Sequence, residues 1–145
     1  MNHATPQMLN FARCLIAHQA EEASLEIPTA TPVVLKLRPY LGTLMGNTGF
    51  CALLSRALAL TGQEVPWLRG VEVNTDGKLG NFDREAAKIS PSEITDGSVV
   101  LIAQLLGLLV SFIGEILTLQ LVRDVWPDLP PETNFSLGDD HEKSN

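Results

Sequence analysis

One stretch of the sequence limits the fold more than any other, because residues 98–122 have the pattern of a single helix dense in Leu, Ile and Val. Between Val99 and Ile113 the clearly polar side chains are Gln104 and Ser111. A helix that is apolar nearly all round is either the buried centre of a bundle or a membrane span. Either the remaining segments cover this helix or a lipid bilayer does.

Small residues recur along this helix at spacings of four and three, which places them on one stripe. They are Ala103, Gly107, Ser111, Gly114 and Thr118. Small side chains let another helix backbone approach closely, and the opposite side of the helix is bulky. We therefore expect the stripe to be an interface, and a homodimer about a two-fold axis would pair it with itself. The alternative is that a helix of the same chain packs on it.

Length and charge point in different directions on membrane insertion. Residues 98–114 extend about 26 Å, slightly less than a ~30 Å hydrocarbon core. Extending the span to Val122 supplies the length but includes Glu115 and Gln120, and no basic cluster flanks it to set an orientation. A soluble, cytoplasmic protein is the preferred interpretation. A membrane-associated subunit anchored by residues 98–122 is the alternative.

Two pairs of residues near the N-terminus have the pattern of helix starts. Thr5 is a capping residue followed by Pro6 at the first helical position, and apolar spacing continues to about Glu22. Thr31 and Pro32 repeat the same signal. The sequence therefore predicts two helices before residue 47.

Proline and glycine divide the middle of the chain. Pro39 lies inside the second helical pattern, which predicts a kink or break near Arg38. A third helix is expected from about residue 48 to residue 61, with Gly62 as its stop signal. Alternating residues around the turn at residues 74–77 then predict a short β-hairpin.

The last helix has the strongest start signal. Ser90 and Glu93 have the spacing of a capping box, with Pro91 at the first helical position. Trp126 precedes Pro127 and ends the helix, since the residue before a proline avoids the α region. The predicted fold is mainly α: a small bundle of about four to five helices around a long apolar C-terminal helix, with a short β-hairpin as an additional element.

The chain of 145 residues is long enough for one domain with its own core. We expect a single helical domain over residues 1–127 and an acidic, flexible tail over residues 128–145. The formal charge is −7 and no basic block is present. Because phosphate backbones are bound by clustered Lys and Arg, nucleic acid is not an expected partner.

Three residues of ligand type lie along one stripe of the first helix. Cys14, His18 and Glu22 are spaced i, i+4 and i+8 and are of types that bind a borderline metal. One helix does not complete a metal site, and no second cluster supplies the remaining ligands, so no metal and no cofactor is expected. The alternative interpretation is a buried cysteine beside a histidine that pairs with Glu22.

Two polar residues of the long helix are candidates for a buried switch. If Glu115 is buried it must be neutral or paired, and Arg123, Arg56 or Arg38 is the expected partner. A structural ion pair is the leading interpretation and a functional switch is the alternative. Gln104, beside the stripe of small residues, is the second candidate.

No spacing in the sequence brings a nucleophile, a base and an orienting group together. The leading hypothesis is a non-enzymatic helical interaction or regulatory module, such as an adaptor, that binds a protein partner or a second copy of itself. The alternatives are the membrane-associated subunit and an enzyme with a dispersed site drawn from His18, Cys51, Glu115 and Arg56. The sequence predicts neither a small-molecule ligand nor a biological process.

Overall fold

The computed structural model describes residues 5–130, and within them five α-helices, one 3₁₀-helix and a two-stranded hairpin. In chain order the elements are α1 (Pro6–Glu22), α2 (Ala30–Gly62), the 3₁₀-helix η1 (Pro66–Gly70), β1 (Glu72–Val73), β2 (Leu79–Gly80), α3 (Phe82–Ala86), α4 (Pro91–Ile113) and α5 (Glu115–Val125). The expected fold class, a small and mainly helical bundle with a short hairpin, is confirmed.

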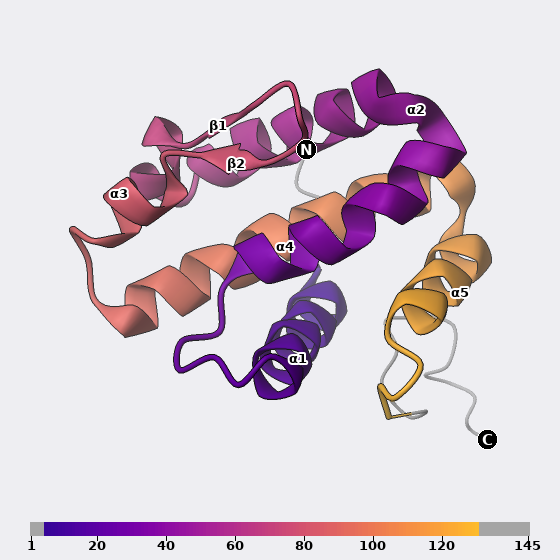
Figure 1. Cartoon of the computed structure of the whole chain (residues 1–145), viewed down its shortest axis with the longest axis horizontal. Coiled ribbons are helices and arrows are strands. Elements are labelled where there is room, and N and C mark those ends of the chain that lie inside the picture. The colour runs from indigo at the N-terminus through magenta and orange to yellow at the C-terminus, as the bar shows by residue number, and fades with distance from the viewer. Residues whose placement is uncertain (1–4, 131–145) are drawn as a thin grey trace.

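Helix α4 is the centre of the bundle. Helices α1, α2 and α5 all pack against it (Figure 1), and every residue from 101 to 109 is buried. Among the described residues, α4 is the one helix whose length and composition would allow it to cross a membrane, and most of it is covered by the rest of the bundle. The apolar helix has the packing expected of a bundle centre.

Two of the three predicted helix starts, at Thr5 and Ser90, are present as capped ends. The start predicted at Thr31 is wrong, because α2 begins at Ala30 and its N-cap is Thr29, whose side chain makes no capping hydrogen bond. The Thr5 hydroxyl accepts a hydrogen bond from the Met8 amide at 3.1 Å. The Ser90 hydroxyl accepts from the Glu93 amide at 3.2 Å, and the Glu93 carboxylate accepts from the Ser90 amide at 3.1 Å. These bonds satisfy backbone donors that the first turn of a helix leaves without an intrahelical partner.

Helix α2 is bent at a glycine rather than at its proline. The kink expected near Arg38 is absent, and the helix continues past Pro39 to Gly46, where the backbone takes φ +82° and ψ 160°. That conformation is essentially restricted to glycine. The two helices predicted on either side of residue 47 are therefore the two arms of one bent helix.

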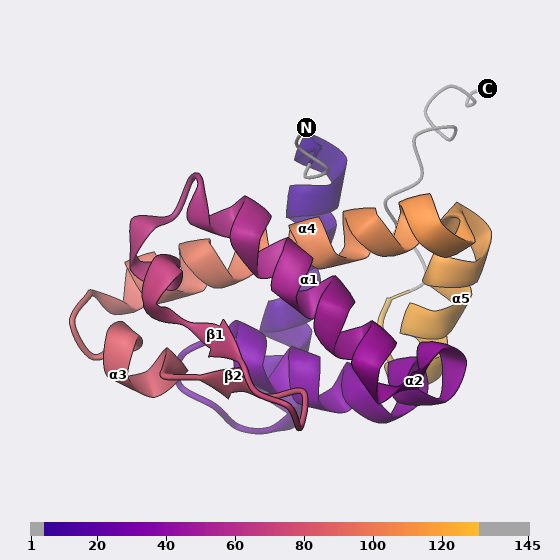
Figure 2. The ribbon, with the colours of Figure 1, turned by 90° about the horizontal axis from the view of Figure 1, so that it is seen from above.

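The prediction of one straight helix over residues 98–122 is wrong. Helix α4 ends at Ile113, and Gly114, with φ +92° and ψ 160°, turns the chain into α5. The bend directs α5 back along the bundle, so that Val122, Val125 and the two apolar residues after it join the core. Figures 1 and 2 show this corner at the same end of the molecule as the bend of α2.

The predicted hairpin is present and packs on α2. Its strands are antiparallel, with Glu72 opposite Gly80 and Val73 opposite Leu79. At the other end of the sequence, Leu129 lies beyond the predicted domain boundary and is buried in the core. Residues 131–145, most of the predicted tail, lie outside the described residues.

Candidate functional site

The bend at Gly114 separates the five small residues expected to share one stripe. Ala103 and Gly107 are buried inside the bundle, whereas Ser111 and Gly114 are exposed at the corner. Thr118 is buried on α5, where its hydroxyl donates to the Gly114 carbonyl at 2.7 Å. In this conformation the part of the expected interface that reaches the surface is the corner itself.

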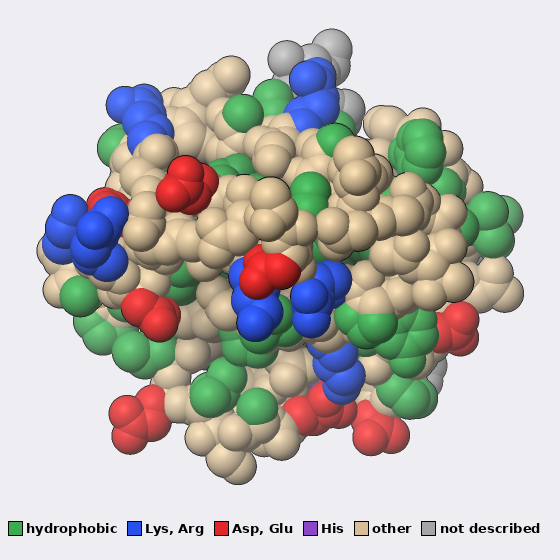
Figure 3. Space-filling view, turned by 45° about the horizontal axis from the view of Figure 1, so that its top comes forward, with side chains coloured by type: hydrophobic (Ala, Val, Ile, Leu, Met, Phe, Trp, Pro, Cys, Tyr) green, Lys and Arg blue, Asp and Glu red, His purple; other side chains and the backbone are tan. Residues whose placement is uncertain are grey.

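Large apolar side chains surround this corner. Phe112 is 65% exposed, Ile116 81% and Leu117 54%, and on α2 Tyr40 is 44% and Leu44 54% exposed. Figure 3 shows hydrophobic side chains at the right-hand end of the molecule, where Figure 1 places the α2 bend and the α4–α5 corner. We call these five residues the corner surface. Isolated exposed apolar residues are ordinary, but a contiguous group of them marks an interaction site.

A hollow of about 650 Å³ lies within the corner surface. Tyr40, Leu44 and Leu117 line it together with Pro39, Thr43, Ile113, Gln120, Leu121 and Asp124. Most of these side chains are apolar, and Asp124 is the one ionisable carboxylate among them. The hollow sits between the first arm of α2 and helix α5, so its shape depends on the angle at Gly114.

The two candidate switch residues have different surroundings. Gln104 is 1% exposed, within the buried stretch of α4. Glu115 begins α5, and its Oε2 atom is buried without a hydrogen-bond partner among the described residues. Of the arginines expected to pair with it, Arg38 donates to the Asp76 carbonyl at 2.8 Å and Arg123 to the Leu129 carbonyl at 3.5 Å. The switch role of Gln104 and Glu115 stays a prediction.

Of the stripe of Cys14, His18 and Glu22, the last two take part in a network of polar contacts with Lys36. The expected contact between His18 and Glu22 is present, with Nε2 to Oε2 at 3.2 Å, and Lys36 of α2 reaches the other carboxylate oxygen of Glu22 at 3.0 Å. Cys14 is exposed, so its predicted burial is wrong. The reason is that Leu15 and Ile16 supply the buried face of α1 and turn Cys14 outward.

Glu22 is held in its ionised form. The hydrogen bond from Lys36 is the largest cause and lowers the pKa of this carboxyl. Burial raises the pKa, and the charges of Lys36 and His18 lower it further. Among the described residues, no three His, Cys, Asp or Glu side chains are grouped closely enough to hold a metal ion. Because His18 and Glu22 are on α1 and Lys36 is on α2, these contacts join the two helices.

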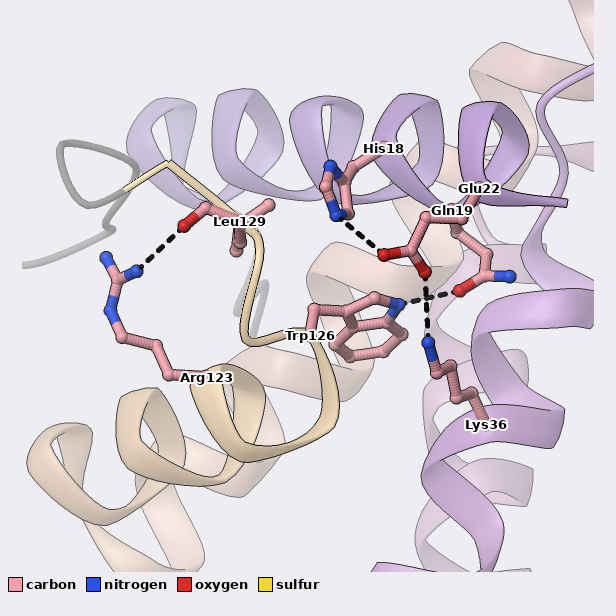
Figure 4. Close-up of polar contacts among 7 residues, drawn as sticks. All are labelled: His18, Gln19, Glu22, Lys36, Arg123, Trp126 and Leu129. Atoms are coloured by element: carbon pink, nitrogen blue, oxygen red, sulfur yellow. Dashed lines mark hydrogen bonds and ion pairs between the residues drawn. The ribbon is translucent and has the colours of Figure 1, made fainter.

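Trp126 is a buried residue that sequence reasoning identified only as a helix end. It is fully buried, its indole Nε1 donates to the Gln19 side-chain oxygen at 2.6 Å, and Lys36 Nζ lies 5.7 Å from the ring centroid (Figure 4). A charge over an indole face is favourable. These contacts hold the end of α5 against α1 and α2. No local sequence pattern could predict them, because Trp126 and Gln19 are 107 positions apart.

The residues proposed for a dispersed enzyme site take part in separate contacts. His18 pairs with Glu22, whereas Cys51 Sγ lies against the hairpin turn, 3.6 Å from the Asn74 carbonyl. Arg56 is exposed, as expected for the outward side of its helix. Comparison of the chain with protein-family models, curated proteins and solved structures finds no match. The corner surface is therefore the feature of the described residues from which a function is best argued.

Proposed function

We propose that this protein is a non-enzymatic helical interaction module that associates with a second copy of itself through the corner surface. The observation that carries the proposal is the group of five large apolar side chains exposed around the α4–α5 bend. Fully burying one Phe or Ile contributes about 1.5–3 kcal/mol. The exposure of these side chains in a single chain leaves that free energy available for association.

A second copy suits this surface because exposed apolar side chains and an apolar hollow lie next to each other on it. Phe112 and Ile116 project most, next to the 650 Å³ hollow that Tyr40 and Leu117 help to line. A two-fold axis brings the same patch of both copies together, so a patch with both shapes is complementary to itself. Thr43 and Gln120 supply polar groups at its edge, as the rim of an interface does.

Charge favours a protein partner over a lipid surface. Asp124 lines the hollow, and the whole chain carries a formal charge of −7. Anionic lipid headgroups attract clustered Lys and Arg, which the corner surface lacks among the described residues. The runner-up is the membrane-associated subunit, which is favoured by the composition of α4.

The test is the molar mass measured by light scattering in detergent-free buffer over a series of protein concentrations. We expect a dimer, with twice the 15.7 kDa of one chain. Ile116→Lys removes one buried side chain from each copy, about 3–6 kcal/mol for the pair, so the dissociation constant should rise at least about 100-fold.

Leu25→Lys is the matched control, because Leu25 is 42% exposed on the connector after α1. The control should remain dimeric under the conditions that dissociate Ile116→Lys. A wild-type mass equal to one chain at every concentration would contradict self-association. Recovery of the protein only with detergent would contradict it too and would favour the membrane-associated alternative.

A further inference from the structure

We infer that the second copy is bound by exchange of α5: Gly114 straightens, α4 and α5 become one helix, and each α5 packs on the partner's α1 and α2. This inference rests on the proposed self-association and specifies how it occurs. The hinge between α4 and α5 is a single residue. Gly114 alone separates the two helices, with φ +92° and ψ 160°. Glycine adopts this conformation without steric strain, and a hinge of one residue favours exchange of an element between copies because a change at a single position releases the whole element.

The straight form gains backbone hydrogen bonds at the hinge. In the bent form α5 begins at Glu115, so the amides of Glu115, Ile116 and Leu117 have no intrahelical acceptor. In a continuous helix these three amides donate to the carbonyls of Ser111, Phe112 and Ile113. The apolar sequence pattern over residues 98–122 is that of this continuous helix.

Straightening also aligns the exposed apolar residues. Phe112 and Ile116, and likewise Ile113 and Leu117, are four positions apart and so lie on the same side of a continuous helix. At a two-fold axis through the hinge, this side faces the same side of the partner helix. The side chains exposed in the single chain are therefore placed where two copies meet.

The contacts of α5 with the bundle are kept in the exchange. In one chain, Thr118 and Val122 are buried on α5, and Trp126 donates to Gln19 and lies against Lys36. Each of these contacts can form with the α1 and α2 of the partner copy, because both copies have the same sequence. In one chain α5 packs on α4 as well as on α2, so the exchange keeps this packing when each α5 also meets the partner's α4, and it adds the hinge and corner contacts.

Gly46 provides a matched control for the hinge. It has nearly the same backbone conformation as Gly114, φ +82° and ψ 160°, and an added Cβ would meet no atom within 4 Å at either position. An alanine at either glycine therefore acts through backbone conformation alone. At Gly46, however, the chain on both sides of the bend is bonded to the hairpin turn, through Arg38 and through Asn47.

The experiment separates oligomers by size, measures their mass by light scattering, and follows amide hydrogen exchange in the peptides that cover residues 111–118. The bent form is strained once alanine replaces Gly114, so Gly114→Ala should lower the dimer dissociation constant at least about ten-fold. Gly46→Ala should not. In the wild-type dimer, the amides of residues 115–117 should exchange at least about ten-fold more slowly than in the monomer.

The outcomes distinguish the two proposals. A dimer whose amides at residues 115–117 exchange as fast as in the monomer overturns the exchange of α5 and leaves surface-to-surface association standing. A wild-type protein that stays monomeric overturns both. Amide hydrogen exchange is measured on the wild-type dimer, without any substitution. The result therefore does not depend on whether Gly114→Ala folds.

Discussion

The two glycine bends have the same backbone conformation but different support. The arms of α2 on either side of Gly46 are both bonded to the hairpin turn, Arg38 to the Asp76 carbonyl at 2.8 Å and Asn47 to the Thr75 carbonyl at 2.9 Å. The α4–α5 corner at Gly114 faces outward with exposed Phe112 and Ile116, and the contacts of Trp126 hold the far end of α5. Glycine can adopt this conformation or a helical one, so the contacts around each glycine decide which of the two persists.

The support at Gly46 comes from the small hairpin. A two-stranded hairpin has little stability of its own, and here its turn lies across the bend of the longest helix. A Cβ at Gly77 would come within 2.9 Å of Arg38 Cδ and 3.0 Å of Phe50 Cε2, one residue from each arm of α2. The hairpin turn therefore supports the bend of α2 from both sides, and among residues 5–130 no comparable hairpin turn contacts both sides of the bend at Gly114.

The largest effect is expected where α5 is anchored. Trp126→Ala removes a fully buried aromatic side chain, and such a deletion lowers the free energy of unfolding by about 3–5 kcal/mol. Urea denaturation followed by circular dichroism measures it. Trp126→Phe keeps most of the ring but loses the hydrogen bond to Gln19, so it should lose only about 1 kcal/mol. Equal losses in the two variants would mean that the hydrogen bond, rather than the packing, anchors α5.

An intermediate effect is expected at the hairpin turn. Gly77→Ala combines a positive φ of +82° with close contacts to Arg38 and Phe50, which together should lower the free energy of unfolding by about 1–3 kcal/mol. The midpoint of thermal unfolding reports it. Thr75→Ala is the control in the same turn, since its exposed side chain should matter by less than about 0.5 kcal/mol. A fully stable Gly77→Ala protein would show that α2 keeps its bend without the turn.

The smallest effect is a dependence on pH between α1 and α2. The pKa of Glu22 is lowered from its ordinary value of 4.5, chiefly by the hydrogen bond from Lys36. A depressed carboxyl pKa stabilises the fold above the unfolded-state pKa, and this stabilisation is lost as the pH falls through the folded-state pKa. Lys36→Met should therefore lower stability at neutral pH, and its difference from wild type should shrink below pH 4.5.

Unfolding free energies measured from neutral pH to about pH 3 test this titration. Lys88→Met is the matched control, because Lys88 is more exposed than Lys36 and its contact with Glu85 is longer, at 3.4 Å. Such surface pairs contribute at most about 1 kcal/mol, so the expected change is small in both variants. A Lys36→Met difference that stays constant with pH would assign its effect to the contact with Trp126 instead.

Helix ends and the hairpin could be predicted from the sequence because their signals are local. Thr5 caps α1, Ser90 and Glu93 cap α4, and the Asp76-Gly77 turn joins two short strands. Each signal depends on residues within a few positions of one another. The apolar composition of α4 likewise predicted a central helix.

The bend at Gly114 could not be predicted, because it depends on what the two arms meet. Gly114 lies in a sequence that is helical on both sides, and a glycine inside such a pattern is compatible with an unbroken helix. The return of α5 depends on the burial of Val122, Trp126 and Leu129 against elements distant in sequence. In α2 the boundary predicted near residue 47 coincides with the bend at Gly46, where the hairpin turn contacts both arms. The additional break predicted near Arg38 does not form, although Pro39 is the stronger local breaker.

The candidate site was predicted in part. The contact of His18 with Glu22 follows from their spacing of four on one helix, whereas Lys36 and Trp126 come from other elements and had no signal. The interface residues Ser111 and Gly114 reach the corner, and Ala103 and Gly107 do not. A stripe on a helix shows which residues share a side, but which neighbour covers that side is a property of the whole fold.

The central position of α4 has a consequence for the chain as it is synthesised. At about 5–20 residues per second, roughly 3–10 s separate the end of α2 from the end of α4 at the ribosome. During that interval α1 and α2 have emerged, but the helix on which their apolar faces pack has not. Exposed apolar segments are what makes such intermediates prone to aggregate. We therefore expect the nascent chain to depend on chaperones until Ile113 has been added.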